Sequence, residues 1–186
     1  MNRRTLVYIT IAVAVVVVIV AFGLASRVPQ TASQAPALAQ LNVGDAAPEF
    51  QAATTQGPFD LHQSLGRPVF LEVFATWCPH CQHEVPIVND LYAKYNNRVA
   101  FIAVNGSPKA IDETSPETQL DVYDFTQRFK VRYPVAFDPD LTVAKLYLQG
   151  GYPTIVIITK DGKIADVMSG DQTEQTLRAD LDAVLR

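Results

Sequence analysis

Residues 69–81 have the sequence VFLEVFATWCPHC, and this stretch decides the fold. Its first seven residues are a nearly continuous apolar run, which is typical of a central parallel strand buried on both faces. The Cys-Pro-His-Cys turn follows directly, and residues 79–95 are predicted to form a helix that begins at Pro79. Proline suits this position because the first turn of a helix needs no amide hydrogen. The two cysteines are therefore expected where a buried strand gives way to a helix N-terminus.

A cysteine at such a junction has the chemistry that thiol–disulfide exchange needs. The backbone N–H groups and the dipole of a helix N-terminus favour negative charge, so the thiolate of Cys78 is stabilised there. The thiolate is the reactive form of the side chain. We therefore expect Cys78 to attack a partner disulfide and Cys81 to resolve the mixed disulfide. His80 is expected to add positive charge beside the thiolate.

Two other uses of the cysteines stay open from the residues alone. A structural disulfide between Cys78 and Cys81 would close a loop too short to stabilise the fold much. A copper site is the second alternative, because the two cysteines and His83, with His80 as a further candidate, are soft ligands. However, no histidine follows residue 83, so no distant imidazole is available to complete it. With two cysteines in the chain, a multi-disulfide scaffold and a four-cysteine zinc site are excluded.

The sequence around this stretch predicts a single α/β domain over residues 42–186, with a mixed sheet and helices on both faces. The hairpin near its start is expected to turn at Gly57-Pro58, and the later one at Asp161-Gly162. The helix over residues 115–129 is predicted to begin with Ser115 as its N-cap and Pro116 in its first turn. The predicted strands are 50–53, 59–61, 69–75, 99–104, 154–159 and 164–168, and the predicted helices are 79–95, 115–129, 141–148 and 173–185.

The N-terminal segment predicts a membrane anchor. Residues 6–25, LVYITIAVAVVVVIVAFGLA, contain no charge, and as a helix they would span about 30 Å, the thickness of a bilayer core. Arg3 and Arg4 precede the run and should stay in the cytoplasm, which places the rest of the chain outside. We favour an uncleaved anchor over residues 1–25, with cleavage near residue 25 or 39 as the alternative. Residues 26–41, rich in Ala, Gln, Ser and Pro, are expected to be a flexible linker.

The charge distribution excludes a further class of partner. Three of the chain's 15 basic residues, Arg3, Arg4 and Arg27, lie in residues 1–41, where there is no acidic residue. The domain therefore carries 12 basic and 19 acidic side chains, a formal net charge of −7. Nucleic-acid binding is not expected, because it requires a cationic surface.

On these motifs, residues 42–186 resemble the thioredoxin superfamily, and most closely its membrane-anchored TlpA/ResA-like thiol–disulfide oxidoreductases. The resemblance implies a thioredoxin-like fold with Cys78 and Cys81 as the redox pair and no organic cofactor. The peroxiredoxins are a poorer match, because Ala75 and Leu71 stand where they need a threonine and a proline. The matching motifs are the opening Gly44…Ala47-Pro48…Phe50, the active-site run 75–81, the helix proline Pro86, the loop Gly151-Tyr152-Pro153-Thr154 and the hairpin turn Asp161-Gly162.

The resemblance also implies roles for residues around the cysteines. Glu72 occupies the position of the buried carboxylate that transfers a proton in thioredoxins, and burial would raise its pKa. Glu84 lies on the same helical stripe as Cys81, where the TlpA/ResA-like family often has a functional glutamate. Pro153 corresponds to the cis-proline beside the cysteines, and Trp77 to an apolar shield. Solvent exposure is the alternative for Glu72, and an acid favoured by the helix dipole is the alternative for Glu84. His62 and His83 are expected at the surface.

Two residues depart from the TlpA/ResA-like pattern. The pair Pro79-His80 is the one found in periplasmic disulfide oxidases, so the direction of electron flow stays open, and we predict an oxidising bias. Tyr152 is bulkier than the residue usually found before the cis-proline. The predicted function is a membrane-tethered, monomeric, extracytoplasmic thiol–disulfide oxidoreductase that acts on protein thiols or disulfides and is recycled by a membrane redox partner. Cytochrome c maturation and general disulfide formation are its two candidate uses. The alternative is a copper-delivery or redox-sensing module that uses the same cysteines.

Overall fold

The computed structural model describes Asn2 and residues 40–186. The predicted anchor over residues 6–25 and the predicted linker up to residue 39 lie outside the described residues. Within the described part of the chain, no helix is both long enough and apolar enough to cross a bilayer.

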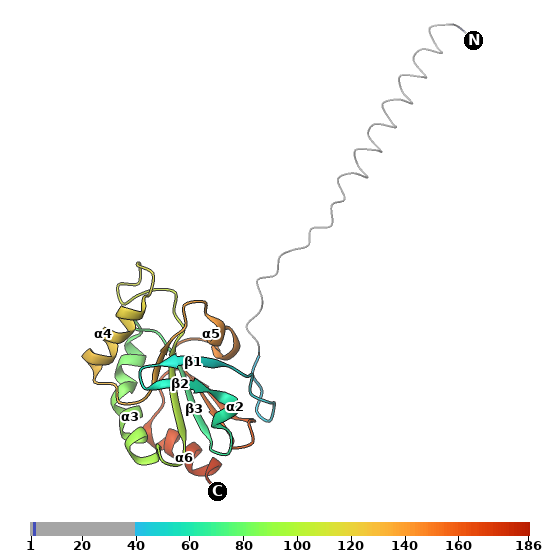
Figure 1. The fold of residues 1–186 in the computed structure, drawn as a ribbon. Coiled ribbons are helices and arrows are strands. Elements are labelled where there is room, and N and C mark those ends of the chain that lie inside the picture. Colours follow the sequence, from blue (N-terminus) through green and yellow to red (C-terminus); the bar gives the residue numbers. More distant parts are fainter. Residues whose placement is uncertain (1, 3–39) are drawn as a thin grey trace. The chain divides into compact units, whose positions relative to one another are not determined.

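The described domain is built on one seven-stranded mixed sheet, with strand order β2-β1-β5-β4-β3-β6-β7 (Figure 1). The strands β3 and β4 run parallel at its centre, β6 pairs antiparallel with β3, and β7 pairs antiparallel with β6. The thioredoxin-like α/β fold is thereby confirmed. The elements in chain order are β1 (Gln51–Thr54), β2 (Gly57–Asp60), α2 (Leu61–Ser64), β3 (Val69–Phe74), α3 (Pro79–Tyr95), β4 (Ala100–Asn105), α4 (Gln119–Phe129), β5 (Val135–Phe137), α5 (Thr142–Tyr147), β6 (Thr154–Ile158), β7 (Ile164–Ser169) and α6 (Glu174–Val184).

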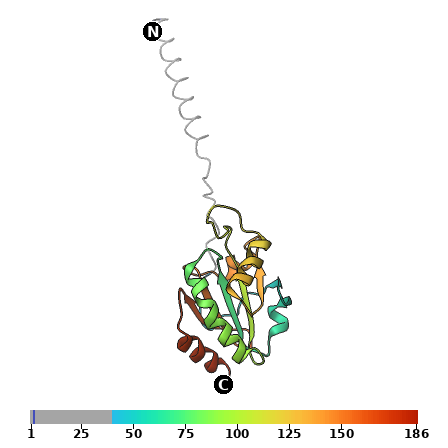
Figure 2. The same cartoon turned by 90° about the vertical axis from the view of Figure 1, so that its left-hand side faces the viewer.

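Helices cover both faces of the sheet, and the central strands are therefore buried on both sides. Every residue of β3, β4 and β6 is buried. One apolar cluster joins one face to α3, α4 and α6, and the other joins the opposite face to α2 and α5. Figure 2 shows the green α3 and the red α6 on one side of the strands and the cyan α2 on the other.

Two predicted boundaries are wrong, and local hydrogen bonds explain both. The helix α4 begins at Gln119 and not after Ser115, because Thr118 and Asp121 form a capping box at that point. Ser115 is instead held by Asp112, which accepts hydrogen bonds from its N–H and its hydroxyl. The first hairpin turns at residues 55–56, since Thr54 pairs with Gly57 and Gly57 already belongs to β2.

Two short elements, α2 and β5, were not predicted at all. The strand β5 pairs in parallel with β4 on one side and antiparallel with β1 on the other, so it joins β4 to the β1–β2 hairpin. The helix α3 occupies the predicted residues, and Gly162, with φ of +80°, forms the predicted β6–β7 turn.

Candidate active site

The two cysteines lie where β3 leads into α3, as predicted. Cys78 is the N-cap residue of α3, and Pro79 follows in the first turn. Both thiols are free in this structure and both are buried, with Cys78 4% and Cys81 1% exposed. Burial raises the pKa of Cys81 far above its usual value, and the charge of Glu72 raises it further. Cys81 therefore keeps its proton, which suits a resolving thiol.

The loop before β6 forms one wall of the site. The Tyr152–Pro153 peptide bond is cis, as the resemblance implied. The Cys78 thiol donates a hydrogen bond to the Tyr152 carbonyl oxygen at 3.5 Å. The Tyr152 hydroxyl donates to the carbonyl oxygen of Gly106 at 2.6 Å, so its bulk connects this loop to the end of β4. Burial raises the pKa of this hydroxyl to about 12, which keeps it a donor.

Trp77 forms the adjoining part of the wall. Its indole N–H donates to the Ser107 hydroxyl at 2.8 Å, and its ring meets the edge of Tyr152 at a centroid distance of 5.7 Å. The side chain is half-buried. This placement supports the predicted apolar shield beside Cys78, and the shielding itself stays a prediction.

Two buried carboxyl groups stand behind the cysteines. Glu72 on β3 is 2% exposed, so the solvated alternative for it is wrong, and Glu84 on α3 is 1% exposed. Burial raises the pKa of Glu84 to about 7, and the nearby charge of Asp171 contributes to the rise. Burial and the charge of Glu84 hold the pKa of Glu72 well above its usual range. Each group has one carboxyl oxygen, Oε2, without a hydrogen-bond partner.

Tyr133 belongs to this buried group, although sequence reasoning missed it. It is 3% exposed, in the segment between α4 and β5, and it is hydrogen-bonded to Glu72. Burial and the charges of Glu72 and Glu84 hold its pKa well above the usual value. No local pattern could have identified it, because its partner lies 61 residues earlier on another strand.

His80 lies at the rim and has a partner that the sequence did not predict. Its Nδ1 is 2.7 Å from Oδ2 of Asp171, in the loop between β7 and α6. The backbone N–H of the next residue, Gln172, donates to Oε1 of Glu84 at 3.1 Å. One short loop thus contacts both the Cys-Pro-His-Cys turn and a buried carboxyl group.

A second buried network fixes the turn before Cys78. The Thr76 hydroxyl and the Asn105 side-chain amide both donate to Glu117, at 2.7 and 3.0 Å. Glu117 is 8% exposed, at the end of the loop that joins β4 to α4. The network therefore holds this loop against the active-site turn.

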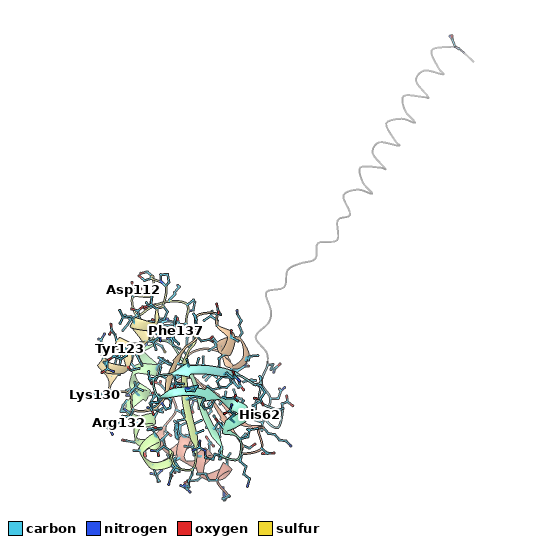
Figure 3. The ribbon with its side chains drawn as sticks, in the orientation of Figure 1. His62, Asp112, Tyr123, Lys130, Arg132 and Phe137 are labelled. Atoms are coloured by element: carbon cyan, nitrogen blue, oxygen red, sulfur yellow. The ribbon has the colours of Figure 1, made fainter. Side chains whose placement is uncertain are left out.

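The remaining histidines lie apart from this chemistry. His83 is exposed on α3, and His62 lies on α2 with 80% of its side chain exposed, across the domain from Asp112 in Figure 3. Among residues 40–186, no group of three or more His, Cys, Asp or Glu side chains is arranged to hold a metal ion.

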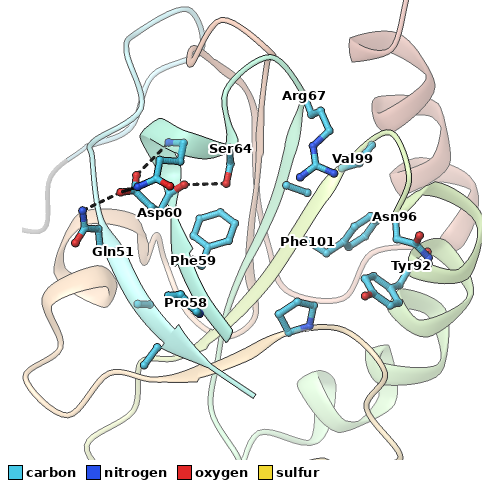
Figure 4. Close-up of a pocket in the computed structure, with 15 residues that line it drawn as sticks. Gln51, Pro58, Phe59, Asp60, Ser64, Arg67, Tyr92, Asn96, Val99 and Phe101 are labelled. Atoms are coloured by element: carbon cyan, nitrogen blue, oxygen red, sulfur yellow. Dashed lines mark hydrogen bonds between the residues drawn. The ribbon is translucent and has the colours of Figure 1, made fainter. Parts of the chain in front are cut away.

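A cleft of about 700 Å³ lies at the other end of α3 from the cysteines. Its lining comes from the β1–β2 hairpin, α2, the last turns of α3 and the start of β4. Figure 4 shows Phe59 and Phe101 on its walls and Arg67 at one end. Neither cysteine lines it, so it does not belong to the redox site.

Comparison with known proteins supports the same chemistry. The Redoxin family profile matches residues 42–185. Thiol-disulfide oxidoreductase ResA of Bacillus cereus is 31% identical over 147 residues, which cover 78% of this chain and 80% of that protein. ResA of Geobacillus thermodenitrificans is 32% identical over 145 residues, covering 76% and 78%.

Solved structures with the same fold include two redox proteins. A Chlorobium tepidum protein assigned as thiol:disulfide interchange protein DsbE matches with a TM-score of 0.70 and 28% identity, over 79% of this chain and 100% of that one. The structure of dsbF from MTB, in mixed oxidised and reduced forms, matches with a TM-score of 0.61 and 26% identity, over 76% and 98%. The region that the Redoxin profile matches takes in both cysteines and both buried carboxyl groups of the site described above.

Proposed function

Since this chain belongs to the redoxin family and is a thiol–disulfide oxidoreductase of the ResA and DsbE type, we propose that it works outside the cytoplasm, tethered to the membrane, on protein thiols and disulfides. Its redox centre is the Cys78–Cys81 pair, and it needs no organic cofactor. A membrane redox partner returns the pair to its starting state.

The observation that carries this proposal is the unequal setting of the two cysteines. Cys78 caps the N-terminus of α3, where the helix dipole favours a thiolate. Cys81 is almost fully buried, and burial together with Glu72 raises its pKa. An attacking thiol at a helix N-terminus and a protonated thiol behind it are what a two-step exchange requires.

In the reducing direction, the Cys78 thiolate attacks one sulfur of a substrate disulfide. The substrate S–S bond breaks, and its second sulfur leaves as a thiolate that takes a proton from solvent. Cys81 then passes its proton to Glu72 or Glu84 in their ionised forms and attacks the Cys78 sulfur. The bond between Cys78 and the first substrate sulfur breaks, and that sulfur leaves as a thiolate and is protonated, so two electrons and two protons reach the substrate as the Cys78–Cys81 disulfide forms. Oxidation of a substrate dithiol is the same sequence reversed.

The membrane location rests on the N-terminal sequence. Residues 6–25 are long and apolar enough to cross a bilayer, and Arg3 and Arg4 favour a cytoplasmic N-terminus. Reduction of cytochrome c cysteines and general disulfide formation are the two candidate uses, and the potential of the couple distinguishes them.

The test compares Cys78→Ser and Cys81→Ser in the full-length chain. Cys78→Ser should abolish disulfide exchange, whereas Cys81→Ser should accumulate a mixed disulfide with substrate, visible on a non-reducing gel. Faster alkylation of Cys81 than of Cys78 in the reduced protein would reverse the two roles. Full-length chain retained in carbonate-washed membranes would support the anchor, and a soluble form starting near residue 26 or 40 would contradict it.

A further inference from the structure

Residues 170–172, the segment between β7 and α6, contact three separate parts of the redox site. The Gly170 N–H donates to the carbonyl oxygen of Pro153 at 2.9 Å. The Asp171 carboxylate lies 2.7 Å from the His80 ring nitrogen. The Gln172 N–H donates to the buried Glu84 carboxylate at 3.1 Å. The segment is therefore fixed at both of Asp171's neighbours, which holds that carboxylate at the rim of the site.

We propose that Asp171 is a positioning residue for His80, and that this pair lowers the oxidising power of the Cys78–Cys81 couple. The inference rests on the proposed function and deepens it, because it names a residue that sets the direction of electron flow. No feature of the Cys-Pro-His-Cys motif itself contains this information, since Asp171 lies 91 residues further along the chain.

The argument begins with the reduced state. A positive charge beside Cys78 stabilises its thiolate, and whatever stabilises the reduced form makes the couple more oxidising. His80 is next but one to Cys78 and would supply such a charge. Asp171 sets a negative charge directly against the ring and accepts the hydrogen of its Nδ1. The field of the histidine at the sulfur is therefore partly cancelled, and the ring is directed toward Asp171.

The same pair contributes little to folding. The His80 and Asp171 side chains are 63% and 44% exposed, and ion pairs at such exposure add little to stability because water competes for both groups. A change in potential without a change in melting temperature is therefore the signature of the proposed role.

The experiment measures the equilibrium of the full-length chain with glutathione. In this reaction the Cys78–Cys81 disulfide takes up two electrons and two protons, and two glutathione thiols become one disulfide. Alkylation of the free thiols followed by mass spectrometry gives the reduced fraction. Asp171→Asn keeps the shape and an acceptor oxygen while it removes the charge. Asp161→Asn is the matched control, because it removes the same charge from the turn at the other end of the β6–β7 hairpin.

We expect Asp171→Asn to shift the equilibrium toward the reduced protein roughly three- to tenfold, or about 14–30 mV by the two-electron conversion. Asp161→Asn should leave it unchanged, and neither variant should change the melting temperature. The shift should shrink when Asp171→Asn is made together with His80→Ala.

A shift toward the reduced protein of less than 1.5-fold in Asp171→Asn would overturn the inference, as would a shift toward the oxidised protein. An equal shift with and without His80 would also overturn it, because Asp171 would then act through its own charge alone. The proposed function fails on a different result, namely disulfide exchange that persists in Cys78→Ser.

Discussion

Replacement of Glu84 by glutamine is expected to change how the stability of this domain depends on pH. Glu84 is 1% exposed, and burial raises its pKa from 4.5 to about 7. In the unfolded chain the side chain is hydrated and ionises near its usual value. Between these two pH values the folded chain holds a proton that the unfolded chain has released.

The sign and the size follow from this difference. The contribution of Glu84 to the free energy of unfolding is fully present below about pH 4.5 and is lost as the pH rises through about 7. One pKa unit corresponds to about 1.4 kcal/mol, so the loss amounts to roughly 3 kcal/mol. Glu84→Gln removes the ionisation, so this part of the pH dependence should disappear. The pH dependence that burial of Glu72 causes remains in both proteins, whereas the share of its raised pKa that comes from the Glu84 charge disappears with that charge.

The assay is urea unfolding of the reduced full-length chain at several values between pH 4.5 and 8. Wild type should lose roughly 3 kcal/mol more than Glu84→Gln over this range. Glu113→Gln is the matched control, because Glu113 is exposed in the loop before α4 and its replacement should leave the wild-type curve intact. Parallel curves for wild type and Glu84→Gln would refute the assigned burial cost. A wild-type stability that rises with pH would refute its sign.

Three further substitutions test contacts around the site. Thr118→Ala removes the capping box of α4 and should lower the free energy of unfolding by about 1 kcal/mol, measured by urea unfolding; an unchanged midpoint would contradict the cap. Gly106→Ala would place a methyl group 2.7 Å from the Ala144 Cβ and 2.8 Å from the Val73 Cγ1, and should destabilise the domain by about 1–3 kcal/mol. A wild-type melting temperature in that variant would show that the backbone moves aside. Tyr152→Phe removes the donor to the Gly106 carbonyl and should cost about 1 kcal/mol while Cys78 alkylates faster; an unchanged alkylation rate would separate this bond from the site.

The central sheet and the active-site helix were predictable because their signals are local and strong. The apolar run over residues 69–75 and the proline after Cys78 specify a buried strand and a helix start without help from the rest of the chain. The start of α4 was not predictable in the same way. Ser115-Pro116 is a valid local start, but Asp112 already engages Ser115, and the cap three residues later prevails. The three-residue strand β5 is too short to show a periodic pattern.

The cysteines of the site followed from their spacing and their place before a helix, and the two glutamates followed from the family resemblance; all four lie within residues 72–84. The residues that hydrogen-bond to this part of the site could not be predicted in the same way. Tyr133, Asp171 and Glu117 reach the site from three later segments, and contacts between distant segments leave no trace in a local pattern. Sequence reasoning therefore identified the redox pair, its buried acids and the walls formed by Trp77 and the Tyr152-Pro153 loop, and it missed the hydrogen-bond partners from distant segments.

The placement of Trp77 gives this protein an intrinsic optical reporter. It is the chain's single tryptophan, and it directly precedes Cys78. Its indole N–H is held by Ser107 and its ring by Tyr152, so its surroundings are defined. Because a neighbouring disulfide quenches indole emission, formation and reduction of the Cys78–Cys81 bond should change the fluorescence of the unlabelled chain. Each half-reaction can then be followed in stopped flow without an attached dye, for wild type and for every variant named above that keeps both cysteines.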